Sequence, residues 1–261
     1  LGGLALGSVV TKFIAGIGIF STFKLLAIAI FVVLLVAAII IKAPEAPTAG
    51  ASKTAAADDN THHYTSAEMM KTSRFWIFFL WAIALNSAGL MVINSAANIS
   101  VAYGGSAVLG MIVSLFNGAG RIVAGNNFDR FGRKTSSIVN NIFMIIAGAL
   151  LIAGGVSHSL ILVVIGLIFV GLSYGGTPTI TTACVNEAFG AKYFATNFSI
   201  ANFSLIPAAI IGPIISAKLL EAAGGKYDSN FRALIVFTLV ALALWIGLNI
   251  ASKKSDNEDY K

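Results

Sequence analysis

The sequence predicts an all-α integral membrane protein. Of its 261 residues, 57% are hydrophobic and only 11% are charged, which is more apolar side chain than a soluble domain of this length buries. The mean hydropathy is +0.87. The apolar residues gather in runs long enough to cross about 30 Å of hydrocarbon as helices. We therefore expect nearly all regular structure to be helical and to lie in a lipid bilayer.

The apolar runs give the candidate transmembrane helices in chain order. The opening stretch, Leu1–Val10, is too short to cross a bilayer, and we interpret it as the end of a helix that begins before this sequence. The spans are expected at Thr22–Ile41, Phe75–Val101, Ser106–Phe128, Thr135–Gly154, Leu160–Ala183, Phe194–Leu220 and Phe231–Ile250. Pro207 and Pro213 predict a bend within Phe194–Leu220.

A polar segment separates the first of these spans from the others. Between Lys42 and Thr72 the composition changes to Pro, Ala, Ser, Thr and Asp, which is typical of a flexible linker. The linker contains His62 and His63, but no cysteine or carboxylate cluster stands at ligand spacing beside them. Cys184 is the only cysteine, which excludes a CxxC motif. We therefore predict no metal site and no cofactor.

The positions of the cations predict the orientation. The net charge is +6, but the cations form short clusters between apolar runs, so we predict no nucleic-acid partner. Alternating the spans across the bilayer collects most of the cations on one side, which the positive-inside rule makes cytoplasmic. That group comprises Lys42, Lys53, Lys71, Arg74, Arg130, Arg133, Lys134, Lys192, Lys253, Lys254 and Lys261.

Arg121 is the most informative single residue, because it lies inside the apolar span Ser106–Phe128. A guanidinium within a bilayer costs several kcal/mol unless it faces a partner, a ligand or water. Arg121 lies eight residues before Asp129, which places it about 12 Å in from the cytoplasmic turn, near the depth at which secondary transporters bind substrate. The alternative is an arginine held by a buried acid, but the carboxylates in the spans, Glu187 and Glu221, lie near helix ends.

A basic turn follows this span and carries a recognisable motif. The pattern Gly-x-x-x-Asp-Arg-x-Gly-Arg-Lys is formed by Gly125, Asp129, Arg130, Gly132, Arg133 and Lys134. It resembles the signature gating loop of the major facilitator superfamily. We expect Gly125 to let helices approach closely, Asp129 to accept hydrogen bonds from the next helix, and the cations to pair with acidic helix ends such as Glu187. The alternative is a merely solvated basic loop.

Two further segments resemble one family within that superfamily. Glu68-Met-Met-Lys-Thr-Ser-Arg-Phe-Trp76 and Phe116-Asn-Gly-Ala-Gly-Arg121 are similar to the oxalate/formate antiporter family of carboxylate transporters. The resemblance runs from the linker nearly to the C-terminus. It implies a major facilitator fold in which the first four helices are absent from this sequence.

The resemblance also implies a division into four parts. Residues 1–43 are expected to be the end of an N-terminal helix bundle, with a partial fifth helix and a sixth helix. Residues 44–72 form the cytoplasmic central linker, 73–252 the C-terminal six-helix transmembrane bundle, and 253–261 a cytoplasmic tail. The missing N-terminal bundle is then a required partner, and we expect this chain by itself not to catalyse transport.

The substrate-binding residues follow from the same resemblance. Arg121 matches the family arginine that binds the substrate carboxylate, and Asn117 lies one helical turn earlier on the same face. Tyr174 falls where the family has an aromatic residue that lines the cavity, although an aromatic residue on a membrane helix is often simply packed. Leu205 stands where oxalate carriers have a lysine, and Asn202 near it is polar but neutral.

These observations predict a secondary active transporter of small organic anions in the cell membrane, plasma or inner, that works by alternating access. The single candidate cation favours monocarboxylates such as formate, lactate or pyruvate over oxalate.

The sequence has no HExxH, GxSxG or P-loop motif, so we predict no enzyme activity. A channel would need rings of pore-lining charges or carbonyl groups, whereas a single arginine beside a gating loop favours a carrier. A non-transporting fragment or sensor that retains a carboxylate-binding pocket is the alternative function.

Overall fold

The structure is a computed structural model that describes residues 2–40 and 62–258. Every regular element in those two segments is a helix. Residues 41–61, which include the first part of the predicted linker, and 259–261, the end of the predicted tail, lie outside the described residues. The chain divides into two compact units, residues 1–61 and 62–261, and each is described by itself.

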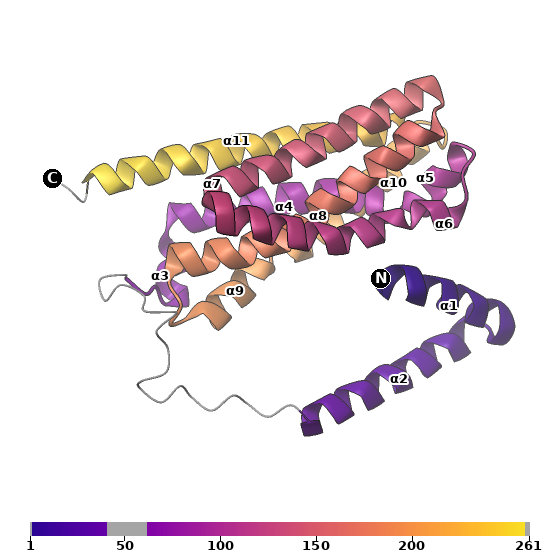
Figure 1. The fold of residues 1–261 in the computed structure, drawn as a ribbon, viewed down its shortest axis with the longest axis horizontal. Coiled ribbons are helices and arrows are strands. Elements are labelled where there is room, and N and C mark those ends of the chain that lie inside the picture. Colours follow the sequence, from indigo (N-terminus) through magenta and orange to yellow (C-terminus); the bar gives the residue numbers. More distant parts are fainter. Residues whose placement is uncertain (1, 41–61, 259–261) are drawn as a thin grey trace. The chain divides into compact units, whose positions relative to one another are not determined.

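The first unit holds two helices, α1 (Gly2–Ile17) and α2 (Ile19–Ile40), joined at Gly18 (Figure 1). Gly18 has a φ of 79°, a conformation that side chains with a Cβ rarely adopt, so a glycine is suited to this turn. Most side chains of α2 are apolar and exposed within the unit, as Phe20 is at 83%. Such a helix belongs in lipid or against other helices.

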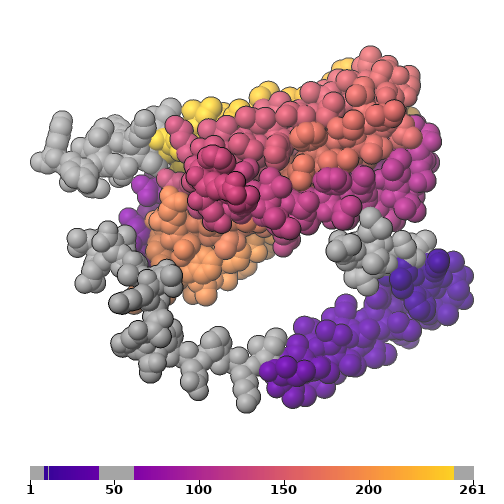
Figure 2. Space-filling view, viewed as in Figure 1, coloured from indigo at the N-terminus to yellow at the C-terminus, as the bar shows by residue number. Residues whose placement is uncertain are grey.

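The second unit contains the remaining helices, which the space-filling view shows closely packed on the face turned to the viewer (Figure 2). They are α3 (Ser66–Lys71), α4 (Ser73–Ile93), α5 (Ala96–Ala102), α6 (Ala107–Gly110), α7 (Ile112–Ser157), α8 (Leu160–Phe189), α9 (Phe194–Asn202), α10 (Leu205–Ala222) and α11 (Asp228–Glu258).

Helix α7 combines two of the predicted spans, which meet at a sharp break. The break is at Gly132, whose φ of 72° and ψ of 179° are not helical. At this point the chain doubles back, and the two halves of α7 run in opposite directions (Figure 1). The predicted turn between Phe128 and Thr135 is therefore present, with Gly132 as its pivot.

Six helical segments among the described residues are long and apolar enough to cross a membrane. They are Ile19–Ile40, Ser73–Ile93, Ala107–Ser157, Leu160–Phe189, Phe194–Ala222 and Asp228–Asn249. The third of them, with 51 residues, contains both halves of α7 and thus two of the predicted spans. The all-α membrane fold predicted from the sequence is confirmed.

The predicted span Phe194–Leu220 is interrupted near its middle. The structure divides it into α9 and α10 at Phe203 and Ser204. Pro207 explains the break, because a proline has no N–H to donate to the carbonyl four residues earlier, which belongs to Phe203. The Ile206 N–H instead donates to the Phe203 carbonyl at 3.0 Å, a tighter turn. The predicted bend in this helix is therefore present.

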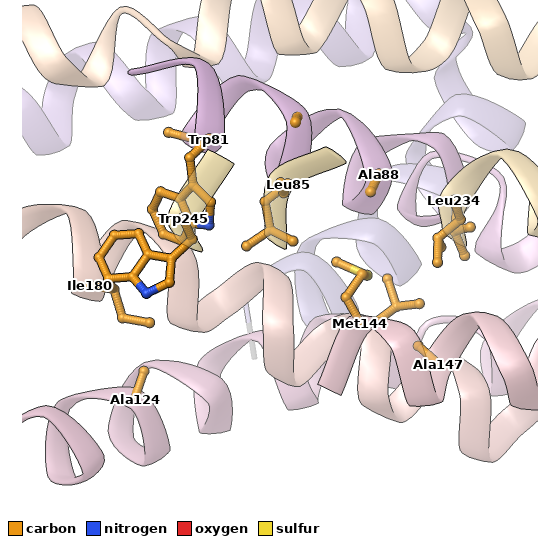
Figure 3. Packing of buried hydrophobic residues seen from close by; sticks show 14 of the residues in the cluster. Trp81, Leu85, Ala88, Ala124, Met144, Ala147, Ile180, Leu234 and Trp245 are labelled. Carbon is orange, nitrogen blue, oxygen red and sulfur yellow. The ribbon is translucent and has the colours of Figure 1, made fainter. Parts of the chain in front are cut away.

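The core of the second unit lies among α4, α7, α8 and α11 (Figure 3). Trp81 of α4 and Trp245 of α11 are fully buried, and their ring centroids are 5.2 Å apart. Leu85, Met144 and Ile180 are also fully buried in this cluster. Burying side chains of this size accounts for roughly 1.5–3 kcal/mol each in water, but in lipid the packing contacts themselves contribute most of the stability.

Glycines bring α7 and α8 into backbone contact. A Cβ on Gly120 of α7 would overlap the Leu172 backbone, and a Cβ on Gly175 of α8 would overlap the Asn117 backbone. Small residues at a membrane helix crossing permit such close packing. Gly125 does not have the close-approach role expected of it, because its nearest neighbour would be the Thr179 Cγ2 atom at an ordinary 3.7 Å. The crossing point of the two helices lies nearer to Gly120.

Candidate functional site

Arg121 lies on the first half of α7, roughly midway between Ile112 and the break at Gly132. Its side chain is exposed on the surface of the second unit. Ile122 beside it is 75% exposed. Within this unit, the other helices therefore do not cover the guanidinium. The reason is its helical register, since Gly120 and Ala124 take the buried face of this helix and turn Arg121 outward.

The structure shows no acidic partner for Arg121. Among the described residues, no carboxylate lies within ion-pair distance of its guanidinium. A cation at this depth of a membrane helix requires water, a ligand or a counter-charge. The arrangement therefore leaves the guanidinium available to an anion that approaches this face of α7.

Tyr174 and Asn117 flank this arginine. Asn117 is half-buried one turn before Arg121 on α7. Tyr174 is half-buried on α8, directly before Gly175, where a Cβ would overlap the Asn117 backbone. A Cβ on Gly89 of α4 would lie only 2.6 Å from the Tyr174 Cδ2 atom, so Gly89 provides the space in which the ring rests. The structure thus brings Arg121, Asn117 and Tyr174 into one region.

Asn202 occupies a different position. It is the last residue of α9, just before the break at Phe203 and Ser204, and it is half-buried. Leu205, where the resemblance expects a lysine, is the first residue of α10 and is also half-buried. The structure records no contact that joins Asn202 to Arg121. Its place in a shared site stays a prediction.

The predicted gating loop surrounds the α7 break. The Arg133 Nε atom lies 3.8 Å from the Glu187 Oε1 atom in the last turn of α8, as expected for a loop cation and an acidic helix end. Arg130 and Lys134 are exposed. Asp129 is also exposed, and no hydrogen bond to its carboxylate is found among the described residues. Asp129 does not cap the following helix, because it lies in the last turn before Gly132.

The end of the linker docks beside this region. The Tyr64 N–H donates to the Phe189 carbonyl at 3.1 Å. The Asn197 Nδ2 atom donates to the Tyr64 carbonyl at 2.9 Å, and the Ser66 hydroxyl donates to the Asn197 Oδ1 atom at 2.9 Å. These bonds fix the residues before α3 to the α8–α9 connection. Asn197 therefore has a structural role rather than one in binding substrate.

A buried polar seam between α7 and α8 was not predicted from the sequence. The Asn140 Nδ2 atom donates to the Thr177 hydroxyl at 3.1 Å, and the Ser173 hydroxyl donates to the Asn140 carbonyl at 2.8 Å. All three residues are buried. Interhelical hydrogen bonds of this kind hold membrane helices together. The signal was a run of Asn and Ser within an apolar span.

The fold and the site define a class of protein, a multi-pass membrane protein with an intramembrane arginine and a basic loop between helices. The comparison of sequences gives the family. Residues 1–206 match the Major Facilitator Superfamily, and the chain belongs to it. The superfamily consists of secondary transporters, which usually reside in the cell membrane. No curated protein is significantly similar to the chain.

Proposed function

We propose that the protein transports small organic anions, monocarboxylates in preference to oxalate, as a member of the oxalate/formate antiporter family. The observation that carries the proposal is Arg121, a cation in the middle of a membrane helix without a carboxylate beside it among the described residues. A guanidinium presents parallel N–H donors that match a carboxylate. Asn117, one turn earlier on α7, and Tyr174 on the adjoining α8 add polar groups to the same region.

Residues 73–252 would form one of the two walls of the binding site. Secondary transporters bind substrate between two bundles, near the bilayer midplane. An exposed Arg121 fits that arrangement, because a side chain at such an interface is not covered by its own bundle. Its partners are the anion, the bilayer and a second helix bundle that supplies the opposite wall. Anion exchange is the transport mode that the family resemblance favours.

Arg121 substitutions test the site directly. We expect Arg121→Ala to abolish binding of radiolabelled lactate and formate by the purified protein while membrane insertion is retained, since removing a charge does not hinder insertion. Arg121→Lys should be partly active at best, because an ammonium cannot reproduce bidentate recognition. Lys218→Ala, which removes an exposed cation on α10 outside the site and the gating loop, is the matched control. Undiminished lactate binding by Arg121→Ala would refute the assignment.

A further inference from the structure

A cavity of about 400 Å³ opens at the end of the second unit opposite the break at Gly132. Its volume falls in the range of small-molecule sites, roughly 300–1,000 Å³. Three segments enclose it: the α5–α6 connection, the end of α7, and the α10–α11 connection with the first turns of α11. Its polar lining comprises Tyr103, His158, Lys226, Tyr227, Asp228 and Arg232.

The walls of the cavity are fixed by packing. Phe231 is fully buried, and its ring centroid lies 6.3 Å from those of both Tyr103 and Tyr227. A Cβ on Gly155 would lie 2.7 Å from the Asp228 Oδ1 atom and 3.3 Å from the Tyr103 hydroxyl. A glycine at this position therefore lets the carboxylate and the phenol converge on one point of the α7 backbone.

The charges in the lining do not cancel. Lys226 and Arg232 each carry a positive charge, and neither forms an ion pair with Asp228. With His158 neutral, two cations and one carboxylate leave an excess of one positive charge. Burial, and next the charge of Asp228, raise the pKa of Tyr103, so its hydroxyl keeps its proton and stays a donor. The lining therefore offers cations and a hydrogen-bond donor to an anion.

The backbone at His158 has an unusual conformation. Its φ of 50° is the one positive φ at a non-glycine residue in the described segments. A glycine is the usual residue where a helix ends in this conformation, because a Cβ there approaches a backbone carbonyl oxygen. Strained positions of this kind gather at ligand sites. The imidazole lies over the cavity with its ring centroid 6.4 Å from that of Tyr103.

We propose that this cavity is a second binding site, separate from Arg121, for a singly charged oxyanion. Lys226 and Arg232 supply the positive charge, Tyr103 and His158 supply hydrogen-bond donors, and Ile152 and Val156 form an apolar wall. The ligand is a free carboxylate in the surrounding medium or the phosphate of a lipid headgroup, because the two present the same oxygen chemistry. The site goes beyond the proposed transport function and does not depend on it.

Protection of an introduced thiol tests the proposal. Cys184, the chain's only cysteine, is buried and is first replaced by serine. Val156→Cys then places a thiol on the cavity wall at a residue that is 76% exposed. The rate of its alkylation by N-ethylmaleimide is measured in detergent-purified protein with sodium lactate, with phosphatidylglycerol micelles, or with sodium chloride of equal ionic strength. Ala222→Cys, exposed but outside the lining, is the matched control.

We expect lactate or phosphatidylglycerol, but not chloride, to slow alkylation of Val156→Cys and to leave Ala222→Cys unaffected. Protection by lactate identifies a free carboxylate as the ligand, and protection by phosphatidylglycerol alone identifies a lipid headgroup. Arg232→Ala should raise the half-protecting concentration by about tenfold or more, the value of one charge-assisted hydrogen bond. The protection should persist in Arg121→Ala protein, which separates this cavity from the transport site. Equal rates under all three conditions would overturn the proposal.

Discussion

Arg133 and Glu187 form an ion pair that joins the segment after the α7 break to the last turn of α8, with 3.8 Å between the Nε and Oε1 atoms. The two side chains are 22% and 50% exposed, so water screens the pair and its contribution is about 1 kcal/mol or less. That is too small to decide whether the protein folds. It is enough to change the ratio of two conformations about fivefold.

Loss of this pair should therefore favour opening at the predicted cytoplasmic end. In a Cys184→Ser background, Ile122→Cys reports access to the region of Arg121. We expect Glu187→Gln to speed its alkylation in inverted vesicles by up to about fivefold, and Glu221→Gln, at another helix end, to leave the rate unchanged. Exchanging the charges with Arg133→Glu and Glu187→Arg should restore the original rate. Equal rates in all variants would show that the pair does not hold the end closed.

Two glycines on α7 make a matched test of helix packing. A Cβ on Gly120 would overlap the Leu172 backbone, whereas a Cβ on Gly118 would meet nothing within 4 Å. We expect Gly120→Ala to destabilise the protein by about 1–3 kcal/mol, because a backbone must move to make room. Gly118→Ala should change stability by less than about 1 kcal/mol. Thermal unfolding in detergent measures both, and similar unfolding temperatures for the two variants would contradict the close crossing of α7 and α8.

Gly89→Ala tests the position of the Tyr174 ring without removing a polar group. The new methyl would lie 2.6 Å from Cδ2, so the ring has to shift. If Tyr174 lines the anion site, we expect both Gly89→Ala and Tyr174→Phe to weaken lactate binding by roughly tenfold, the value of one hydrogen bond to a charged group. Gly247→Ala, whose Cβ would meet nothing within 4 Å, is the control. Full affinity in Tyr174→Phe would reduce the tyrosine to a packing role.

The N-terminus of α3 should respond to acid. Glu68 accepts a hydrogen bond from the Thr65 N–H at 2.8 Å and another from the Thr65 hydroxyl at 2.9 Å. These bonds, the backbone one first, lower the pKa of Glu68 below its ordinary value of 4.5. A lowered pKa means that the stabilisation is complete above pH 4.5 and is lost as the pH falls through the lower folded-state value.

Trp76 reports on this helix, because its indole N–H donates to the Met70 carbonyl at 2.7 Å. We expect Trp76 fluorescence in the wild-type protein to change as the pH is lowered below 4.5. Glu68→Gln should lose that transition, since an amide does not titrate. Fluorescence of the Trp76→Phe protein comes from the two buried tryptophans alone, so subtracting it isolates the Trp76 signal. If the fluorescence transition persists in Glu68→Gln, a group other than Glu68 causes it.

The sequence predicted the helices well, because hydropathy over a whole span is a strong and local signal. It predicted the turn near Gly132 and the bend near Pro207 for the same reason, since glycine and proline act on their own backbone. It did not predict the register of α7. Whether Arg121 or Gly120 faces the bundle depends on the helices that pack beside α7, and nothing local in the sequence encodes that choice.

The same limit applies to two further features of the structure. The motif predicts a close helix approach at Gly125, but the partner helix sets the crossing point, which lies nearer to Gly120. The cavity around His158 joins residues from three separate connections, Tyr103, His158 and Lys226 among them. Such a cluster has no common spacing in the sequence and becomes visible only when the helix ends are placed together.

The last prediction concerns substrate charge. Leu205 stands at the start of α10, and the sequence has no Lys or Arg between Tyr193 and Ala217. With Arg121 as the cation of the site, a monocarboxylate is neutralised, whereas a dianion leaves one charge uncompensated in a low-dielectric cavity at a cost of several kcal/mol. We therefore expect the unmodified protein to bind formate and lactate more tightly than oxalate, and Leu205→Lys to shift the preference toward oxalate. Each 1.4 kcal/mol of that shift appears as about tenfold in relative affinity. The preference is measured by competition binding of oxalate against lactate. The wild-type protein, Leu205→Lys and a Leu205→Met control are compared. Tighter binding of oxalate than of lactate by the wild-type protein would contradict the single-cation site.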